Sequence, residues 1–406
     1  MPKNDVIIDQ PYLLVTSIPC YYDRAGGLWL DRLWHHDLTE HLQYIANLNL
    51  CAPALPRENA CSDLARVEIP DNHQLKLIGL PPQLSAYAAF CAMPRTAAIL
   101  WHAIGEAQIV HSGIIGWPYP LGWISNPFAV LRRKKLVIVV ESSWRRSEDE
   151  TRTWRVRLLN GLSEVLGRWA CRHARVAIFT QAAYRDTLLG GRKECAYVMP
   201  AVWVNEPFIL NTKAAEMTWE KKVTQPVRLL FAGQMTANKG IKVLLSALRL
   251  LDARGIQVQL DLIGNGELRE SCLRAAVNCQ TLRLSVLNSL PYGPAFFELL
   301  QQYHALVIPS LSDEQPRILF DAYARAIPVI ASDTDGLRPY VQQDRTGWLV
   351  PKGDAPTLAE TIERATVNGQ KLRDMGMSAL EVIPRYTHKA MHRTRSHILK
   401  QHFSQA

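Results

Sequence analysis

Residues 309–336 have the sequence PSLSDEQPRILFDAYARAIPVIASDTDG, which holds the clearest succession of secondary-structure signals in the chain. We expect the apolar run 305–310 to be a strand, which passes through a short polar loop into an apolar helix at 317–325. Pro316 suits the first position of that helix. A second strand at 328–332 follows. A strand, a helix and a strand in this order predict a parallel sheet covered by helices.

The same alternation extends to both sides of this stretch and indicates two α/β domains. In the second half we expect strands at 227–233, 258–264 and 282–286 and helices at 239–253, 267–277 and 294–303. The pattern is weaker in the first half, where we expect strands at 12–17, 107–111, 136–140, 176–180 and 196–200 and a helix within 30–48. Residues 205–225 are polar without a clear period, which predicts a linker.

Composition limits the class of protein. A chain of 406 residues is too long for one ordinary core and suits two domains of roughly 150–200 residues each. The N-terminus lacks the apolar stretch of a signal peptide, and no apolar run predicts a membrane span, so we expect a cytoplasmic protein. The 8 cysteines are scattered without metal-site spacing, so we expect reduced thiols and no metal. The net charge of +9 favours anionic partners, but no nucleic-acid motif accompanies it.

Two carboxylates in the opening stretch are the first candidates for chemistry. Asp313 and Asp321 are separated by seven residues, too far apart to reach the same ligand atoms. This spacing suits a ligand with hydroxyls at both ends and a diphosphate between them, and free N–H groups at the helix start suit a phosphate. The alternative is that Asp313 caps the helix and Asp321 is solvated.

The stretch 309–336 and the later segment 345–350 (RTGWLV) together resemble the donor-site signature of the retaining glycosyltransferases of family four, which have the GT-B fold. The resemblance is strong over about 227–365 and weaker over 12–205. It implies an α/β fold of two Rossmann-like, doubly wound domains that face a cleft, with a C-terminal helix crossing back. The implied domains are an acceptor-binding one, 1–207 with 386–406, and a donor-binding one, 208–385.

The resemblance also implies roles for residues of the second half. Asp313 would contact the donor sugar and Asp321 the ribose, and Glu314 could take over the role of Asp313. In 231–240 (FAGQMTANKG), Lys239 matches the lysine that neutralises the diphosphate, whereas Gln234 stands where the family usually has arginine. The remaining donor-site candidates of this half are Gly233, Pro316 and Arg317.

Candidates on the acceptor side lie in the first half. Gly26 and Gly27 match the glycine loop of the family, and His111 ends an expected strand. Glu141 stands at a strand end where many relatives have histidine, and it could orient or deprotonate an acceptor hydroxyl. The alternatives are a structural role for His111 and a salt bridge from Glu141 to Arg145 or Arg146.

The function implied is transfer of a sugar, with retention, from a nucleotide-diphosphate sugar to a hydroxyl in exopolysaccharide, cell-envelope or lipid-linked glycan synthesis. The hexosyltransferase would need neither metal nor cofactor, because Lys239 and helix amides replace a metal, and Asp333 and Asp335 are expected to be structural. Aromatic and basic residues of the first half suggest peripheral contact with the inner face of the membrane. Two alternatives are a sugar-nucleotide epimerase and a non-catalytic membrane scaffold.

Overall fold

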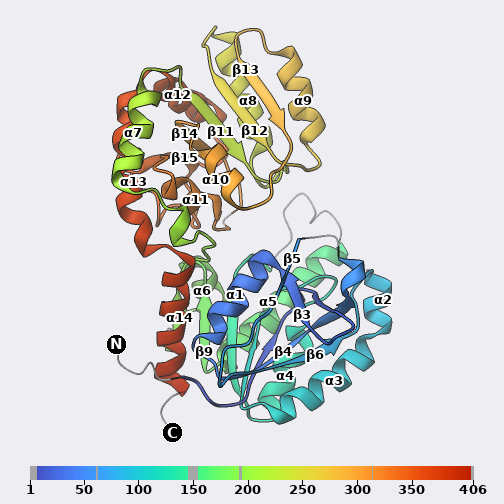
Figure 1. Ribbon diagram of the computed structural model, residues 1–406. Helices are drawn as coiled ribbons and strands as arrows, with labels where there is room; N and C mark the ends of the chain where they lie inside the picture. Colours follow the sequence, from blue (N-terminus) through green and yellow to red (C-terminus); the bar gives the residue numbers. More distant parts are fainter. Residues whose placement is uncertain (1–6, 61–62, 145–153, 192–193, 313, 404–406) are drawn as a thin grey trace. The chain divides into compact units, whose positions relative to one another are not determined.

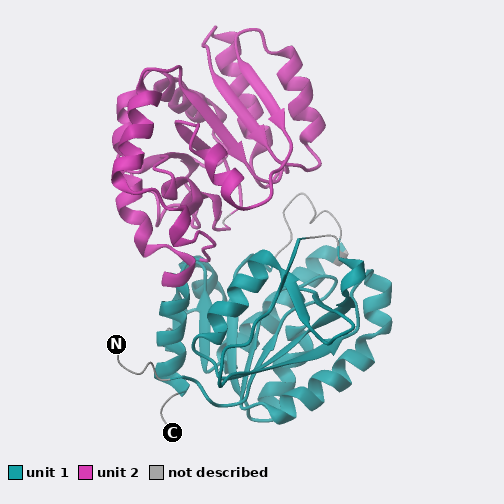
Figure 2. Ribbon diagram, viewed as in Figure 1, with its two compact units in different colours: residues 1–200, 391–406 teal, residues 201–390 magenta. Residues whose placement is uncertain are grey.

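The computed structural model describes residues 7–60, 63–144, 154–191, 194–312 and 314–403. The chain divides into two compact units (Figure 2): residues 1–200 with 391–406 form the first, and residues 201–390 form the second. The sequence boundaries, 207/208 and 385/386, differ from these by a few residues. The end of the chain therefore returns to the first unit, as the resemblance implies.

Parallel pairing organises the second unit, which holds six strands among its described residues (Figure 1). Their order is β13-β12-β11-β14-β15-β16, and every neighbouring pair is parallel. The strands are β11 (Arg228–Ala232), β12 (Gln259–Ile263), β13 (Arg283–Leu287), β14 (Ala305–Ile308), β15 (Val329–Ser332) and β16 (Gly347–Val350). The strands predicted for this half are confirmed to within two residues at each end.

Helices alternate with these strands, as apolar periodicity predicts. They are α7 (Thr212–Val223), α8 (Ile241–Ala253), α9 (Arg269–Asn278), α10 (Pro294–Leu300), α11 (Ile318–Ala324), α12 (Ala355–Thr366) and α13 (Gly369–Val382), with 3-10 turns at Glu206–Phe208 and Ile383–Arg385. The predicted linker at 205–225 is wrong, because most of it is α7. Asn211 caps that helix, and the buried Trp219 donates its indole N–H to the carbonyl of Ala326 at 2.9 Å.

The first unit is built on a larger sheet. Ten described strands follow the order β10-β9-β8-β7-β1-β4-β2-β3-β5, with β6 also paired to β4. They are β1 (Tyr12–Val15), β2 (Cys20–Tyr22), β3 (Leu28–Asp31), β4 (Asn47–Pro56), β5 (Leu64–Arg66), β6 (Gln74–Leu80), β7 (Ile109–Ser112), β8 (Lys135–Val140), β9 (Val176–Phe179) and β10 (Ala196–Val198). The sheet is parallel except at the ribbon formed by β2, β3 and β5.

Helices cover this sheet as well. They are α1 (Arg32–Leu42), α2 (Ala86–Cys91), α3 (Met93–Glu106), α4 (Gly122–Leu131), α5 (Trp154–His173), α6 (Ala182–Leu189) and α14 (His388–Phe403), with a 3-10 turn at Arg57–Asn59. The helix predicted within 30–48 is shorter than that range, because β3 and β4 take its two ends. Strands β2 to β6 escaped prediction; of these, β5 and β6 have no fully buried run of residues that would mark them.

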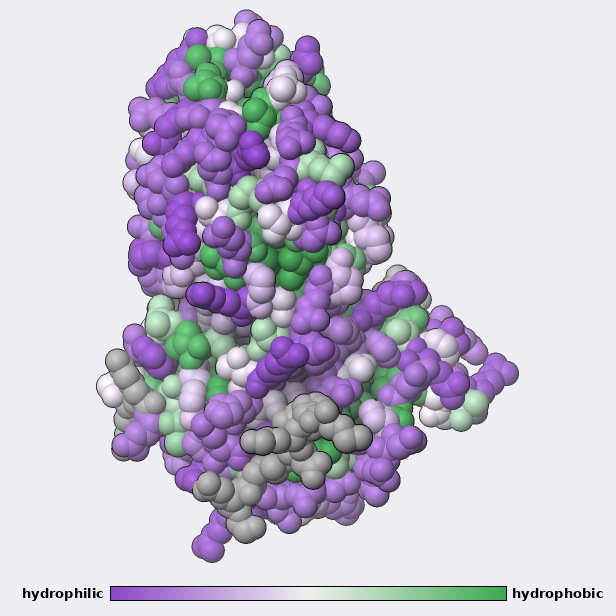
Figure 3. Space-filling view, turned by 60° about the vertical axis from the view of Figure 1, so that its left-hand side comes forward, coloured by the Kyte–Doolittle hydropathy of each residue, from purple (hydrophilic) through white to green (hydrophobic). Residues whose placement is uncertain are grey.

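Within the described ranges, no helix combines the length and the apolar character needed to cross a membrane. On the face drawn in Figure 3, hydrophilic residues cover most of the surface and hydrophobic residues form smaller patches between them. The cysteines that the structure describes are all free.

The packing of α13 in the second unit predicts the effect of a glycine substitution. Alanine normally favours a helix over glycine by about 1 kcal/mol. At Gly376, however, an added Cβ would lie 2.1 Å from the carbonyl oxygen of Ala326. We therefore expect Gly376→Ala to lower the free energy of unfolding by about 1–3 kcal/mol, measured by urea denaturation.

The matched control is Gly161→Ala in α5, where an added Cβ meets nothing within 4 Å. This change should leave stability equal or higher. Equal stabilisation by both substitutions would contradict the packing argument.

Candidate functional site

The loops that leave β11 and β14 lie together at the carboxyl edge of the second sheet. Strand β11 pairs with β12 on one side and with β14 on the other, so the strand order reverses between them. In open α/β sheets, ligands bind outside the carboxyl ends of the strands at such a reversal. The described candidate residues of the second half lie in or next to these loops.

Backbone contact holds the two loops against each other. Gly240 has a φ of 76°, and a Cβ there would lie 1.7 Å from the carbonyl oxygen of Pro309, so only glycine fits without displacing the strand end. The amide of Leu311 donates to the carbonyl of Asn238 at 2.9 Å, and that of Ser312 donates to the same oxygen at 3.2 Å. This contact fixes the position of Lys239.

Lys239 and Glu314 form an ion pair across these loops. The Lys239 Nζ lies 3.4 Å from Glu314 Oε2, and the two side chains are 26% and 30% exposed. Gly233 and Gln234 begin the same loop and are exposed. Asp313 lies outside the described residues. An anion that enters this site would compete with the Glu314 carboxylate for Lys239.

Asp321 is buried on α11, only 4% exposed, so the alternative of a solvated carboxylate is wrong. The hydroxyl of Tyr292 donates to Asp321 Oδ1 at 2.8 Å. Burial raises the pKa of Asp321 to about 7, against the opposing effects of the Tyr292 hydrogen bond and of Arg317. A carboxylate held in this way can accept hydrogen bonds from the hydroxyls of a ligand. Alternatively, its hydrogen bond to Tyr292 serves only to hold α11 in position.

The start of α11 differs from the prediction. The helix begins at Ile318, and Arg317, its N-cap residue, places its guanidinium 4.9 Å from the ring centre of Trp203. The amides of Leu319 and Phe320 already donate to the carbonyls of Pro316 and Arg317. Those two N–H groups are therefore engaged, and the helix start offers a phosphate fewer amides than expected.

Asp333 and Asp335 both pair with Arg338, at 2.6 and 2.9 Å. This agrees with the structural role expected for the two carboxylates.

The glycine pair of the first half forms a tight turn between β2 and β3. Gly26 has a φ of 78°, and the amide of Gly27 donates to Asp23 Oδ1 at 2.7 Å. Asp23 also accepts from the amide of Ala25 and from the indole of Trp29. The turn is thus closed around Asp23, and its role toward an acceptor stays a prediction.

The other two acceptor-side candidates differ in exposure. His111, on β7, is 5% exposed, and its Nδ1 lies 2.9 Å from the Tyr12 hydroxyl, inside the unit. Glu141 directly follows the end of β8, as the sequence predicts, and its side chain is 46% exposed. Its Oε1 lies 3.9 Å from Nη2 of Arg395, whereas Arg145 and Arg146 lie outside the described residues.

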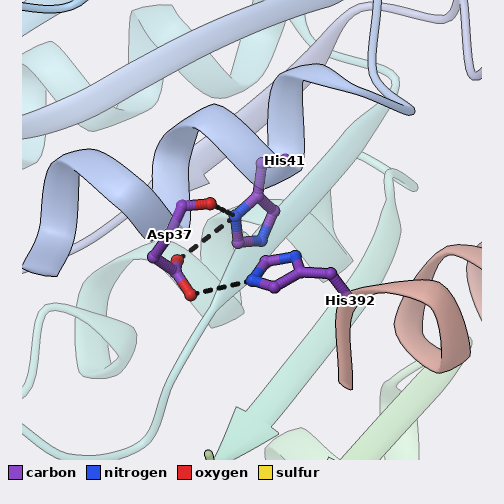
Figure 4. A group of neighbouring side chains, drawn as sticks. All are labelled: Asp37, His41 and His392. Carbon is purple, nitrogen blue, oxygen red and sulfur yellow. Dashed lines mark hydrogen bonds and ion pairs between the residues drawn. The ribbon is translucent and has the colours of Figure 1, made fainter. Parts of the chain in front are cut away.

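Sequence reasoning missed a buried polar network in the first unit. Asp37 and His41 lie one turn apart on α1 and point toward His392 of α14 (Figure 4). Asp37 Oδ1 lies 3.0 Å from His392 Nε2, and Asp37 Oδ2 lies 3.2 Å from His41 Nδ1. The i, i+4 spacing of Asp37 and His41 was visible in the sequence, but nothing local to α1 pointed to a partner 355 positions away.

These three side chains could hold a metal by distance alone, since their ligand atoms lie within 4.8 Å of one another. The hydrogen bonds of His41, however, favour a protonated Nδ1 that does not bind a metal. Arg395 Nη1, which can only donate, lies 3.2 Å from His41 Nε2, so Nε2 must accept and Nδ1 must carry the proton. A metal would need the lone pair of Nδ1. The cluster is therefore better described as a hydrogen-bond network that fastens α14 to α1.

The network predicts acid sensitivity. Burial holds the pKa of His392 well below its ordinary value of 6.5, so the folded state keeps it neutral while the unfolded state takes up a proton below that pH. The free energy of unfolding should therefore fall below pH 6.5, by about 1.4 kcal/mol per pH unit for one such histidine. His392→Gln should remove the contribution of this histidine to the dependence of the free energy of unfolding on pH. Denaturation at several pH values between 7 and 5 measures this dependence.

The control for this prediction is His397→Gln, an exposed position of the same helix, which should leave the slope unchanged. A slope that His392→Gln does not alter would show that His392 is not the group responsible.

Comparison with known proteins finds a family match within the second unit. Residues 226–368 match the family described as glycosyl transferases group 1. The amylovoran biosynthesis glycosyltransferase AmsK of Erwinia amylovora is 30% identical over 147 residues, which cover 34% of this chain and 36% of that protein. The chain thus spans about a third of the length of this curated relative.

Solved structures extend the likeness to the whole fold. Sucrose-phosphate synthase from Thermosynechococcus elongatus has a TM-score of 0.71 at 17% identity, over 98% of this chain and 100% of that one. HepE of Anabaena, solved in complex with UDP-glucose, has a TM-score of 0.66 at 14% identity, over 97% and 100%. Residues 226–368 therefore match the glycosyl transferases group 1 family, in a chain with the two-domain GT-B fold.

Proposed function

We propose that this protein is a retaining hexosyltransferase that moves a sugar from a nucleotide-diphosphate sugar to an acceptor hydroxyl in polysaccharide or lipid-linked glycan synthesis. One observation carries the proposal. Lys239, Glu314 and the buried Asp321 lie in or next to the loops at the carboxyl edge of the sheet, in the segment that matches the group 1 family. This arrangement supplies a cation for a diphosphate and a carboxylate for hydroxyls.

The names of similar proteins support the donor and the pathway class. AmsK is named for amylovoran biosynthesis, and a relative in Staphylococcus aureus for capsular polysaccharide biosynthesis. HepE has been solved with UDP and glucose, and with UDP-glucose. UDP is therefore the first nucleotide to test, and a glycan hydroxyl is the expected acceptor.

The proposed chemistry depends on stabilising the leaving group. The bond between the sugar and the diphosphate breaks while the acceptor oxygen attacks from the same face, and the acceptor proton passes to the departing diphosphate. Lys239 would exchange its pairing with Glu314 for the diphosphate and offset the charge that develops there. Because a lysine supplies this charge, the reaction would need no metal. Glu141 would orient the acceptor.

Removal of Lys239 tests this function. We expect the wild-type protein to bind one of UDP, GDP or ADP in EDTA as well as in Mg²⁺, measured by isothermal titration calorimetry. Lys239→Ala should weaken that binding by about 10- to 100-fold, because a charge-assisted hydrogen bond is lost.

The exposed Lys213 on α7 provides the control, and Lys213→Ala should bind as the wild type does. If no nucleotide binds the wild type, the donor-site assignment fails. Binding that requires Mg²⁺ would contradict metal independence.

Contact with the inner face of the membrane completes the proposal. Trp154, Leu158 and Val165 of α5 are 70%, 65% and 64% exposed and lie on one face of the helix. Arg172 follows on the same face. A helix with exposed apolar side chains and arginines suits an anionic lipid surface. This contact would bring the enzyme to a lipid-linked acceptor.

Vesicle sedimentation tests the membrane contact. The protein should sediment with vesicles that contain phosphatidylglycerol, and Leu158→Glu combined with Val165→Glu should reduce the bound fraction at least several-fold. Val277→Glu, at a valine of α9 that is 84% exposed, is the matched control and should sediment normally. Equal sedimentation of all variants would remove α5 from the membrane contact.

A further inference from the structure

The ribbon of β2, β3 and β5 extends past the carboxyl edge of the first sheet (Figure 1). Strand β1 ends at Val15, opposite Cys51, whereas β4 continues to Pro56. Over this extension β4 pairs with β2, and Tyr22 lies opposite Pro56. The two strands are parallel, so they end at the same place. The ribbon therefore projects beyond the edge of the sheet at which Glu141 follows β8.

A groove of about 530 Å³ lies where β2 and β4 end. It is lined by the last residue of each strand and the two residues that follow it, which are Tyr22, Asp23, Arg24, Pro56, Arg57 and Glu58. Tyr22 is 44% exposed. Its ring gives the groove an accessible aromatic surface with a polar tip, on which the apolar face of a sugar ring can stack.

The guanidinium of Arg57 is held in a fixed orientation beside this surface. It lies 3.5 Å from the ring centre of Trp29, which donates its indole N–H to Asp23 Oδ2 at 2.8 Å. The amides of Ala25 and Gly27 hold Asp23 in turn. Stacking engages the face of the guanidinium and leaves the N–H groups at its edge accessible. No carboxylate of the described residues pairs with Arg57, so a ligand can use these donors.

Glu58 supplies acceptors beside these donors. Its Oε1 lies 3.3 Å from Arg24 Nη2, in a pair whose two side chains are exposed. A sugar hydroxyl both donates and accepts, so carboxylate oxygens and guanidinium N–H groups together can bind several hydroxyls of one ring. Asp23 and Glu58 would repel a phosphate in the same groove. The mixture of charges therefore favours a sugar over a nucleotide or a nucleic acid.

The distance from Glu141 determines which sugar the groove can bind. The registers of the three parallel pairs between β8 and β4 place Val140 level with Pro53. Three strand spacings amount to about 14 Å, and the three residues from Pro53 to Pro56 add about 10 Å along the strand. A single sugar ring does not span this separation. The groove therefore suits a sugar that lies several units away from the one that reacts.

We propose that this groove is a remote acceptor subsite, in which a sugar that does not react stacks on Tyr22 and forms hydrogen bonds with Arg57 and Glu58. The acceptor is then an oligosaccharide chain rather than a single sugar. This inference rests on the proposed function, because it assumes that the first unit binds the acceptor, and it adds the class of acceptor. Contacts with a part of the substrate that does not react give the enzyme binding energy that only longer chains supply.

The experiment measures the binding of mono-, di-, tri- and tetrasaccharide fragments of several bacterial polysaccharides to the full chain on a glycan array. In at least one series, we expect the tetrasaccharide to bind the wild type about tenfold more tightly than the monosaccharide, because stacking and hydrogen bonds are added. Tyr22→Ala and Arg57→Gln should each reduce this preference at least several-fold, whereas Tyr22→Phe, which keeps the ring, should retain it. Tyr87→Ala, at a tyrosine of α2 that is 81% exposed, is the matched control and should bind as the wild type does.

A parallel titration with UDP, GDP and ADP separates this inference from the proposed function. If no nucleotide binds the wild type, the proposed function fails and the acceptor role of the groove fails with it. If a nucleotide binds but Tyr22→Ala keeps the preference for longer chains, the subsite is overturned while the donor site stands. The wild type alone provides a test that needs no folded variant, because equal binding of mono- and tetrasaccharides in every series overturns the inference.

Discussion

The close approach of Gly240 to Pro309 is the contact on which the candidate site depends. The backbone of Gly240 comes so close to the end of β14 that an added Cβ would lie 1.7 Å from the carbonyl oxygen of Pro309, so a side chain here would push the two loops apart. Lys239 precedes this glycine and Glu314 follows the opposing strand end, so the ion pair is a direct result of the contact. The loops leave the sheet at its carboxyl edge, and the glycine allows them to come close enough for Lys239 and Glu314 to pair.

The second unit could be predicted well because its signals are local. Apolar runs of strand length alternate with amphipathic helices, so β11 to β15 and α8 to α11 follow from the sequence alone. The exception is α7, where polar residues hide a helix whose stability comes from the burial of Trp219. Tertiary packing determines whether such a segment is helical, and the periodicity of its apolar residues does not show this.

The candidate site was predictable in part. Lys239, Glu314 and Asp321 belong to motifs, and the structure brings Lys239 and Glu314 into contact. The contact of Tyr292 with Asp321 could not be found in this way, because this hydrogen bond joins residues that are 29 positions apart in the chain. The exposure of Glu141 could not be predicted either, because the buried run of β8 ends at Val140 and the sequence does not show whether the next side chain is covered.

The ion pair between Lys239 and Glu314 has a consequence for how the site responds to salt. Salt screens the attraction between an unpaired lysine and a phosphate ligand, so the affinity for that ligand falls as salt rises. Here the protein carries its own counter-ion at 3.4 Å. A diphosphate would displace a tethered carboxylate rather than free ions, which makes binding less sensitive to ionic strength. The same carboxylate competes with chloride and inorganic phosphate for Lys239.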